Sequence, residues 1–250
     1  MIPAQKRMSG NEIDVKLIQM TSKDKRTLVV RFRITGFLRF LSHLETMKMF
    51  ERALKRAGLE LCYSAGFNPR PKLSAPLARS VGLVCADDLL YASVWVDSAA
   101  VSAVEIRNRI ESQLPAGCDI VDVELAGAKT SFAAEWAVYE FRLADCVDGE
   151  ALSERVEELA GRIERGDAIV VDRKGHKGKA SRQVDAGGYI ESVECGASSL
   201  TAKCRTTPSG SIRIDEILRL LQLDDSSLAG AVVRKFVGWK RNQKKNLKEG

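Results

Sequence analysis

The chain has 250 residues, of which 45% are hydrophobic and 29% are charged, so it is long enough for two small domains with a real hydrophobic core. It contains no run of about 18 apolar residues and begins without the apolar centre of a signal peptide, which argues against a membrane span and predicts a cytoplasmic location. Its six cysteines form neither a CxxC pair nor the CxxxCxxC motif of an iron–sulfur cluster, so we expect no metal and no other cofactor, with a composite site from distant cysteines as the alternative.

The positive charge is concentrated at the C-terminal end. Residues 234–250 hold seven Lys or Arg and one Glu, a sum of +6, whereas the remaining 233 residues hold 32 basic and 32 acidic groups. Because Phe236 and Trp239 lie between the cations, the segment suits nucleic-acid phosphates or an acidic protein surface. The alternative is a solvated end without a partner. We expect a basic tail over 240–250, which includes Lys240 and Arg241 as candidate binding residues.

The first half of the chain predicts a βαββαβ unit over residues 27–128, after a polar N-terminal extension over 1–26. Alternating residues predict a half-buried strand at 27–34, and Ser42 with Glu45 forms a capping box that starts a helix ending before Gly58. The pattern then predicts a short strand at 59–63, a strand at 89–96, a helix at 101–114 and a strand at 118–126.

The second half, residues 129–239, is predicted to repeat this order. Apolar residues at helical spacing from Leu152 to Ile163 predict one helix, and those from Ile214 to Leu221 predict another. Strands are expected at 135–143, 168–171, 189–194, 200–208 and 231–239. The sequence therefore predicts an α+β fold of two tandem ferredoxin-like (βαββαβ) domains with antiparallel sheets. This repeat is inferred from element order alone, because the halves share no strong sequence identity.

A proline-rich basic loop, "YSAGFNPRPKL", follows the first helix. Its prolines hold Asn68 and Arg70 in extended geometry, so the loop is ordered in advance of binding. Arg70 and Lys72 alternate with a proline and are flanked by Tyr63 and Phe67, a pattern that suits phosphate binding and base stacking. The alternative is that the prolines and aromatic rings pack a corner while the cations stay solvated.

A histidine lies at the start of the first helix. His43, beside Arg39 and Glu45, suits an acid/base role or anion binding near a helix N-terminus. Since the chain has only two histidines, a packing or orienting role is the alternative.

A second basic segment, "RKGHKGKASR", spans residues 173–182 between two predicted strands. Its cations suit phosphate contacts, and they also suit an ordinary exposed loop; they include Lys174, Lys177, Lys179 and Arg182. The chain has no Walker loop, GxGxxG, GxSxG or HExxH motif, and so it lacks the defining parts of common nucleotide-binding proteins, hydrolases and zinc proteases.

Residues 31–73, "RFRITGFLRFLSHLETMKMFERALKRAGLELCYSAGFNPRPKL", resemble the radical-SAM-linked protein family of unknown function, whose members show "SHLD…ERA.RRAGLP..YS.GFNP.P". The resemblance continues through "IVVDRKGHKGKASRQVDAGGYI" and "RTTPSGSIRIDEILRLL" to about residue 237. Glu45 stands where the family usually has Asp, and Gly187 and Gly188 stand where a bulkier pair is expected. The positions that fall in the signature are Arg39, Ser42, His43, Glu45, Arg56, Tyr63, Ser64, Gly66, Phe67, Asn68, Pro69 and Pro71.

The resemblance implies an accessory or substrate-presenting protein for a separate radical SAM enzyme, since this chain lacks the cluster cysteines. We expect it to bind RNA or another anionic substrate in one basic groove, where His43, the loop from Tyr63 to Lys72 and the basic segment 173–182 converge. The absence of a complete catalytic constellation favours a non-enzymatic role. One alternative is a protein-interaction module without nucleic-acid binding.

The other alternative is a metal-independent endoribonuclease. The predicted layout is similar to that of repeat-associated RNA-processing endoribonucleases, which pair two ferredoxin-like domains. In this alternative His43 acts as the acid/base, and Lys48 or Arg52 stabilises the phosphate.

Overall fold

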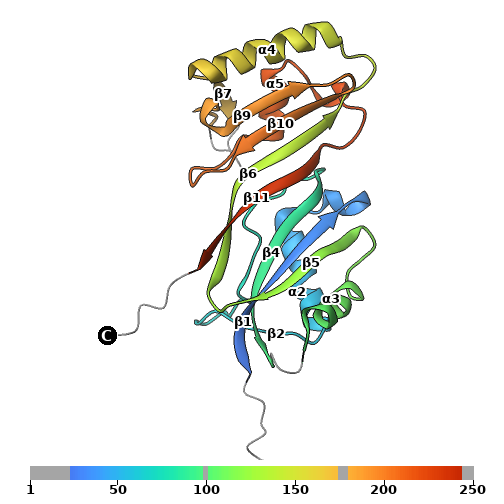
Figure 1. The fold of residues 1–250 in the computed structure, drawn as a ribbon, viewed down its shortest axis with the longest axis vertical. Helices are drawn as coiled ribbons and strands as arrows, with labels where there is room; N and C mark the ends of the chain where they lie inside the picture. Colours follow the sequence, from blue (N-terminus) through green and yellow to red (C-terminus); the bar gives the residue numbers. More distant parts are fainter. Residues whose placement is uncertain (1–22, 98–100, 174–179, 244–250) are drawn as a thin grey trace, which may run out of the picture.

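The computed structural model describes residues 23–97, 101–173 and 180–243. Within these residues, four α-helices and a large, mostly antiparallel sheet make a mixed α+β fold (Figure 1). None of the described helices is long and apolar enough to cross a membrane.

Nine strands form the large sheet: seven lie in the order β5-β1-β4-β11-β6-β10-β9, and the two short strands β2 and β3 pair with β4. The strands of the first half are β1 (Asp24–Ile34), β2 (Glu60–Leu61), β3 (Leu73–Ser74), β4 (Val84–Val96) and β5 (Cys118–Ala126). Those of the second half are β6 (Thr130–Arg142), β9 (Ile190–Cys195), β10 (Ser199–Arg205) and β11 (Val233–Gln243). A separate hairpin consists of β7 (Val170–Arg173) and β8 (Arg182–Asp185).

The first half packs two helices against one face of its strands. The helical elements are the 3-10 helix η1 (Gly36–Phe40), α2 (His43–Arg56) and α3 (Ala103–Glu111). The predicted capping box is confirmed, because the Ser42 N–H donates to the Glu45 carboxylate at 2.8 Å and the Glu45 N–H donates to Ser42 Oγ at 3.3 Å. Gly58 follows α2 with a φ of +72°, a left-handed conformation that glycine adopts without strain.

The core of the first half forms where alternate residues of β1 meet the helices. Leu28, Val30, Phe32 and Ile34 are buried together with Phe50 of α2, as the alternating pattern predicts. On the opposite face Thr27 and Val29 are buried as well, whereas Arg33 is exposed, so the strand is half-buried only near its end.

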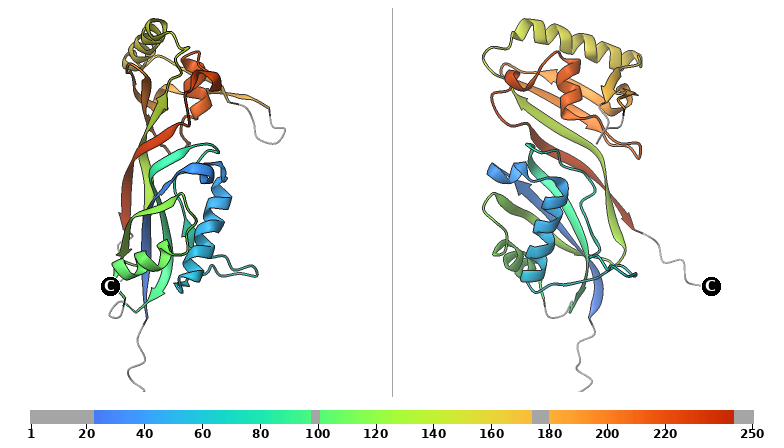
Figure 2. Two further views of the ribbon diagram at one scale, coloured as in Figure 1. Left: turned by 90° about the vertical axis from the view of Figure 1, so that its right-hand side faces the viewer. Right: turned by 180° about the vertical axis from the view of Figure 1, so that it is seen from behind.

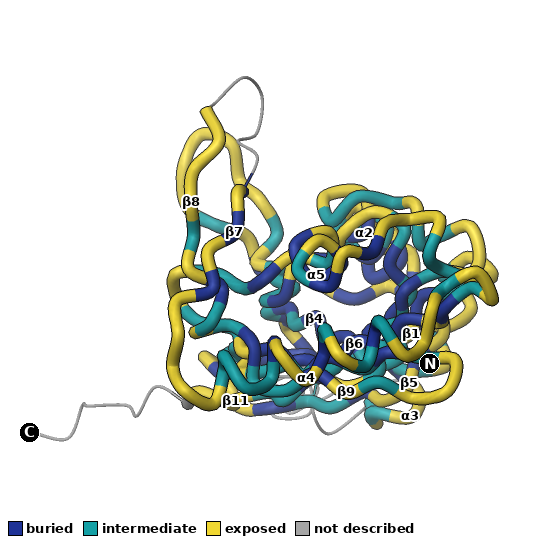
Figure 3. Tube along the Cα trace, turned by 90° about the horizontal axis from the view of Figure 1, so that it is seen from above, coloured by how far each residue is buried: buried dark blue, intermediate teal, exposed yellow. Residues whose placement is uncertain are grey.

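The second half has a core cluster that also includes Leu77 and Leu83 of the first half. Its helical elements are α4 (Gly149–Arg165), α5 (Ile214–Leu220) and the 3-10 helices η2 (Gly187–Tyr189) and η3 (Asp225–Ser227). Leu152 and Val156 of α4 and Ile217 of α5 pack against Phe141 of β6 and Leu200 of β10 in one cluster. The β7–β8 hairpin leaves the body between α4 and β9, and is exposed along most of its length (Figure 3).

Strand β11 joins the two halves into one sheet. It pairs in parallel with the start of β4, at Val233 with Val84, and antiparallel with the whole of β6, ending at Gln243 with Thr130. On the face of β1 opposite α2 and α3, Val29, Leu89 and Ala126 form a small cluster with Tyr91 of β4, Phe132 of β6 and Trp239 of β11. The halves are therefore packed against each other on both faces of the sheet. In two of the views, α2 and α5 lie on the same side of this sheet (Figure 2).

The last strand extends into the range predicted as a C-terminal tail. Strand β11 continues to Gln243, so Lys240 and Arg241 lie in a strand and not in a tail. Arg234, which the charge count placed at the start of the basic end, is 1% exposed and therefore belongs to the interior. The expectation failed because the charge count took no account of the alternation of inward and outward side chains along a strand. Residues from 244 onward lie outside the described part.

A candidate ligand site between the two halves

A cavity of about 750 Å³ lies where the two halves meet. Its walls come from η1, from the segment 77–83 before β4, from the segment 211–218 that includes α5, and from the segment 225–232 that leads into β11. Tyr139 of β6 and Arg234 of β11 complete the lining. This volume is that of a site for a small organic molecule, and such sites often lie between domains.

Arg234, which lines the cavity, forms a buried ion pair with Asp88 between the two halves. Arg234 donates from Nε to Oδ1 of Asp88 at 2.8 Å and from Nη2 to Oδ2 at 2.5 Å, while Nη1 donates to the carbonyl of Ala78 at 3.1 Å. Asp88 is 4% exposed and Arg234 is 1% exposed. Burial alone would lower the pKa of Arg234, but the charge of Asp88 and its hydrogen bonds outweigh burial, so the pKa is raised. The Arg234 guanidinium is therefore charged at neutral pH, and the Asp88 carboxylate is its counter-ion.

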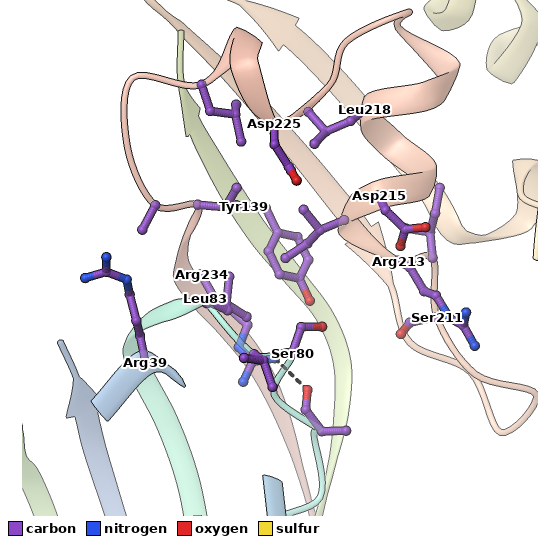
Figure 4. A pocket seen from close by; sticks show the side chains of 18 of the residues that line it. Arg39, Ser80, Leu83, Tyr139, Ser211, Arg213, Asp215, Leu218, Asp225 and Arg234 are labelled. Atoms are coloured by element: carbon purple, nitrogen blue, oxygen red, sulfur yellow. Dashed lines mark hydrogen bonds between the residues drawn. The ribbon is translucent and has the colours of Figure 1, made fainter. Parts of the chain in front are cut away.

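Tyr139 supplies a neutral polar group beside this pair. Burial raises the pKa of its phenol above the usual value, and the nearby charge of Arg234 opposes that rise. The hydroxyl is therefore protonated at neutral pH and can donate or accept a hydrogen bond. Figure 4 shows Tyr139 and Arg234 between Arg39 on one side and Arg213 with Asp215 on the other.

The walls combine apolar surface with cations from both halves. The apolar lining includes Leu77, Val81, Leu218 and Leu228. Arg39 from η1 is half-exposed and places its guanidinium 4.4 Å from the centre of the Phe40 ring. On the opposite wall, Arg213 and the carboxylates of Asp215 and Asp225 line the cavity, and Asp215 is already paired with Arg219 at 2.9 Å. The cavity thus offers apolar contact together with guanidinium groups that suit a carboxylate or phosphate.

Arg79 fixes the wall of the first half in place. Its guanidinium is buried and donates to the carbonyls of Leu38 at 3.3 Å, Arg39 at 2.8 Å and Leu41 at 2.7 Å. It also donates to the carbonyl of Leu83 at 3.2 Å and to the Thr46 hydroxyl at 2.8 Å. One side chain therefore holds η1, the first turn of α2 and the segment before β4 together, which prepares the cavity wall before any ligand binds.

His43 lies near the same junction, although it does not line the cavity. Its pKa is lowered first by burial and then by the charges of Arg234 and Arg79, and only Asp88 opposes the shift. The imidazole is therefore neutral at pH 7. The carboxylate of Glu45 accepts from the Ser42 N–H and hydroxyl, and these hydrogen bonds lower its pKa. The structure thus assigns Glu45 to the helix cap.

The predicted convergence of the proline-rich loop with His43 is wrong. Tyr63 at the base of the loop contacts Lys55, whose Nζ lies 5.6 Å from the ring centre, near the C-terminal end of α2. His43 is twelve residues earlier, about 18 Å along the helix axis. The reason is the pairing of β2 and β3 with the last third of β4, which makes the loop leave the sheet at the far end from the cavity. The remaining candidates of this loop lie at the same far end of the sheet: Phe67, Asn68, Arg70 and Lys72.

Arg182, the described end of the basic segment 173–182, lies at a third location. Arg182 is exposed at the start of β8 in the second half. Lys174, Lys177 and Lys179 lie outside the described residues. Arg173, counted among the solvated cations of this segment, is instead buried and donates to both oxygens of Glu216 at 2.7 and 2.8 Å. Alternation along β7 turns Arg173 inward.

The cations of β11 are engaged with acids of neighbouring strands. Lys240 lies 3.6 Å from a carboxylate oxygen of Glu135, and Arg241 lies 2.8 Å from one of Glu124. Arg241 also lies over the ring of Phe132, on the sheet face opposite α2 and α3. Among the predicted site residues that the structure describes, Arg39, His43 and Glu45 lie together around the N-terminus of α2.

Lys48 and Arg52, the predicted phosphate-stabilising residues of the endoribonuclease alternative, are exposed on α2. They line a different, shallower hollow with Glu45, Arg56 and the segment 112–115. The endoribonuclease activity stays a prediction.

The cysteines form no cluster in the described part of the chain, and neither do groups of His, Asp or Glu that could hold a metal ion. All six thiols are free, and four of them are buried, as expected for small core side chains. Burial raises the pKa of Cys118 and of Cys204 to about 12, so both are neutral thiols.

The sequence analysis missed Arg234 and Tyr139, which line the cavity, and Asp88, which pairs with Arg234. Asp88 lies in the apolar run "LVCADDLLYA" and Arg234 in "AVVRKFVGW", and a charge inside an apolar strand is a usable signal of a buried ion pair. The partner of each charge is 146 residues away and cannot be identified from local pattern. Nothing in the sequence marks Tyr139 as a site residue beyond its place in a predicted strand.

The fold and the cavity define an α+β protein with one sheet shared by two halves and a ligand-sized site between them. The family model described as "Uncharacterized protein conserved in bacteria (DUF2344)" matches residues 27–226, and the chain belongs to this family. The matched range covers the first half and all of the second half up to η3. A comparison with curated proteins gave no match.

Proposed function

We propose that this protein is a non-catalytic accessory protein that binds a small molecule with an anionic group in the cavity between its halves and presents it to a separate enzyme. The observation that supports this most directly is the composition of the cavity. Apolar side chains line most of it, Arg39 and Arg213 face it from opposite walls, and Tyr139 supplies a neutral hydroxyl.

The partner that we propose is a radical SAM enzyme, as the resemblance over residues 31–73 implies. Part of this segment, η1 with Arg39 and Phe40, forms one wall of the cavity. A partner that contacts the signature residues near the N-terminus of α2 would therefore stand beside the bound molecule.

We also infer that the halves are two tandem ferredoxin-like units fused through β11. In the first half the strand order is β5-β1-β4 followed by β2 and β3, and in the second half it is β11-β6-β10-β9. In both, the first strand lies between the last strand and the strand before the second helix, as a βαββαβ unit requires. The β7–β8 hairpin is an insertion after the first helix of the second unit.

Ligand capture tests the proposed function. Purified protein is incubated with a small-molecule extract of bacterial cells, washed and denatured, and the released compounds are identified by mass spectrometry. Val81→Trp should abolish enrichment, because Val81 lines the cavity and is 62% exposed, so an indole there occupies the cavity without disturbing the core. The matched control is Val104→Trp on α3, at a position 67% exposed and outside the cavity lining.

Arg39→Gln should reduce the enrichment of carboxylates and phosphates more than that of uncharged compounds. If wild-type protein and Val81→Trp release the same compounds, the cavity is not the binding site and the proposal fails.

A further inference from the structure

The proline-rich loop forms a rigid arm, here called the aromatic arm, over residues 62–72. The N–H of Ser64 donates to the carbonyl of Arg70 at 2.8 Å, and the N–H of Arg70 donates to Ser64 Oγ at 3.0 Å. The N–H of Lys72 donates to the carbonyl of Cys62 at 2.8 Å, and Tyr63 forms a bridge with Pro71. The arm is therefore a closed, hydrogen-bonded hairpin, and it projects from the body beyond α2 (Figure 2).

The tip of the arm presents an aromatic ring with no cover. Phe67 has a relative exposure of 105%, the highest of the exposed large hydrophobic side chains in the described chain. Gly66 before it has a φ of +126°, which side-chain-bearing residues rarely adopt, so the turn that presents Phe67 depends on glycine. Tyr63 at the base is 44% exposed and has the Lys55 ammonium near its face. A rigid segment that keeps two aromatic rings in solvent indicates a binding surface.

The charges within the arm itself have one sign. No Asp or Glu occurs between Cys62 and Ala86, and Arg70 and Lys72 are exposed without a carboxylate partner among the described residues. The residues beside Phe67 are small or polar: Ala65, Gly66 and Asn68.

We propose that the aromatic arm binds single-stranded nucleic acid, with a base stacked on Phe67, a second base on Tyr63, and backbone phosphates on Arg70 and Lys72. Stacking on a π-face accepts every base, and guanidinium and ammonium groups attract phosphate without reading sequence. The site is independent of the cavity, because it lies at the opposite end of α2, so either proposal can fail without the other.

Fluorescence anisotropy with labelled 12-nucleotide oligo(U) and oligo(dT) tests this proposal on the full-length chain, between about 50 and 200 mM KCl. Phe67→Ala should weaken binding about 5- to 100-fold at each salt concentration and leave the salt dependence unchanged, because it removes stacking alone. Arg70→Gln combined with Lys72→Gln should lower the slope of log K against log salt by about 1.4, since each lost phosphate contact contributes about 0.7.

Two matched controls separate the arm from the rest of the surface. Phe37→Ala removes another exposed phenyl ring, 90% exposed, near the cavity. Arg165→Gln with Lys235→Gln removes two surface cations of the second half that are paired with Asp167 and Glu140. Both should bind like the wild type. Binding of RNA, of DNA or of both supports the proposal when Phe67→Ala weakens it. Equal affinity of Phe67→Ala and wild type, or no binding at about 50 mM KCl, overturns it and leaves the arm for protein contacts.

Discussion

Asp88 and Arg234 are the residues on which the junction of the two halves depends. A buried ion pair repays the cost of removing two charges from water only when both partners are present and well aligned. Here both oxygens of Asp88 accept from Arg234, and a third donor of Arg234 reaches the carbonyl of Ala78. Loss of either partner would leave one charge buried without compensation.

Asp88→Asn should therefore lower the free energy of unfolding by about 3–5 kcal/mol, because Arg234 keeps its charge and loses its counter-ion. Urea denaturation at pH 7 measures the loss. The neighbouring Asp87→Asn is the matched control: Asp87 pairs with Arg31 at the surface, where the Arg31 side chain is 42% exposed, and its loss should cost about 1 kcal/mol or less. Equal losses of unfolding free energy in the two variants would show that the buried pair contributes no more to stability than the surface pair.

The pKa of His43 should reflect the charges at this junction. Its pKa is lowered by burial and by Arg234 and Arg79, so it should lie below the ordinary value of 6.5 in an NMR titration. As pH falls below 6.5, the unfolded chain then binds more protons than the folded chain, and folding stability should decrease until the folded pKa is reached. His43→Gln should remove this part of the pH dependence. A folded pKa at or above 6.5 would contradict the placement of His43 beside two cations.

At the scale of single elements, β11 has no room for a side chain at Gly238. It pairs with β4 and β6, and its ladder with β6 contains an irregularity between Gly238 and Trp239. A Cβ built on Gly238 would lie 2.3 Å from two atoms of the Trp136 indole. Trp136 must therefore move if any side chain is placed there.

Gly238→Ala should destabilise the protein by about 1–3 kcal/mol, the usual cost of forcing extra volume into a packed site. Gly149→Ala is the control, because Gly149 begins α4 with open space around it and should gain a few tenths of a kcal/mol from the lower flexibility of the unfolded chain. Thermal unfolding of both variants checks the difference. A neutral Gly238→Ala would mean that the indole moves aside without cost.

The helices could be predicted because their signals are local. The spacing of Leu152, Val156 and Leu159 places one face of α4 in the core, and Gly166 with a φ of +71° ends the helix. Strand β6 was predicted to start five residues late, at 135 in place of Thr130. Its first residues pack through Phe132 on the rear face of the first half, a contact that no alternation within β6 reveals.

The candidate site could be predicted only in part, for the same reason. Arg39 and His43 were found because a local pattern, the helix start, marks them. The cavity depends on β11 returning across the whole chain to lie between β4 and β6, which brings Arg234 beside Asp88. The pairing of β11 with β4 and β6 is set by long-range packing, which local patterns do not reveal. The cations of the proline-rich loop were assigned to the same groove only because they are close to His43 in sequence.

At the scale of the whole molecule, the shared sheet should make the two halves unfold together. Strand β11 completes the sheet of the second half and also binds the first half, through its pairing with β4 and through Trp239 on the rear face. Neither half can lose its strands without exposing apolar surface or the Asp88–Arg234 pair of the other. Two independent domains joined by a linker would share none of these contacts.

Hydrogen exchange measured by mass spectrometry tests this coupling. The most protected amides of β1 in the first half and of β10 in the second half should open with the same free energy, equal to that of global unfolding. Asp88→Asn should then lower both values by the same amount, although Asp88 belongs to the first half alone. If β10 keeps its wild-type protection in Asp88→Asn while β1 loses its own, the halves are separate folding units and β11 is only a contact between them.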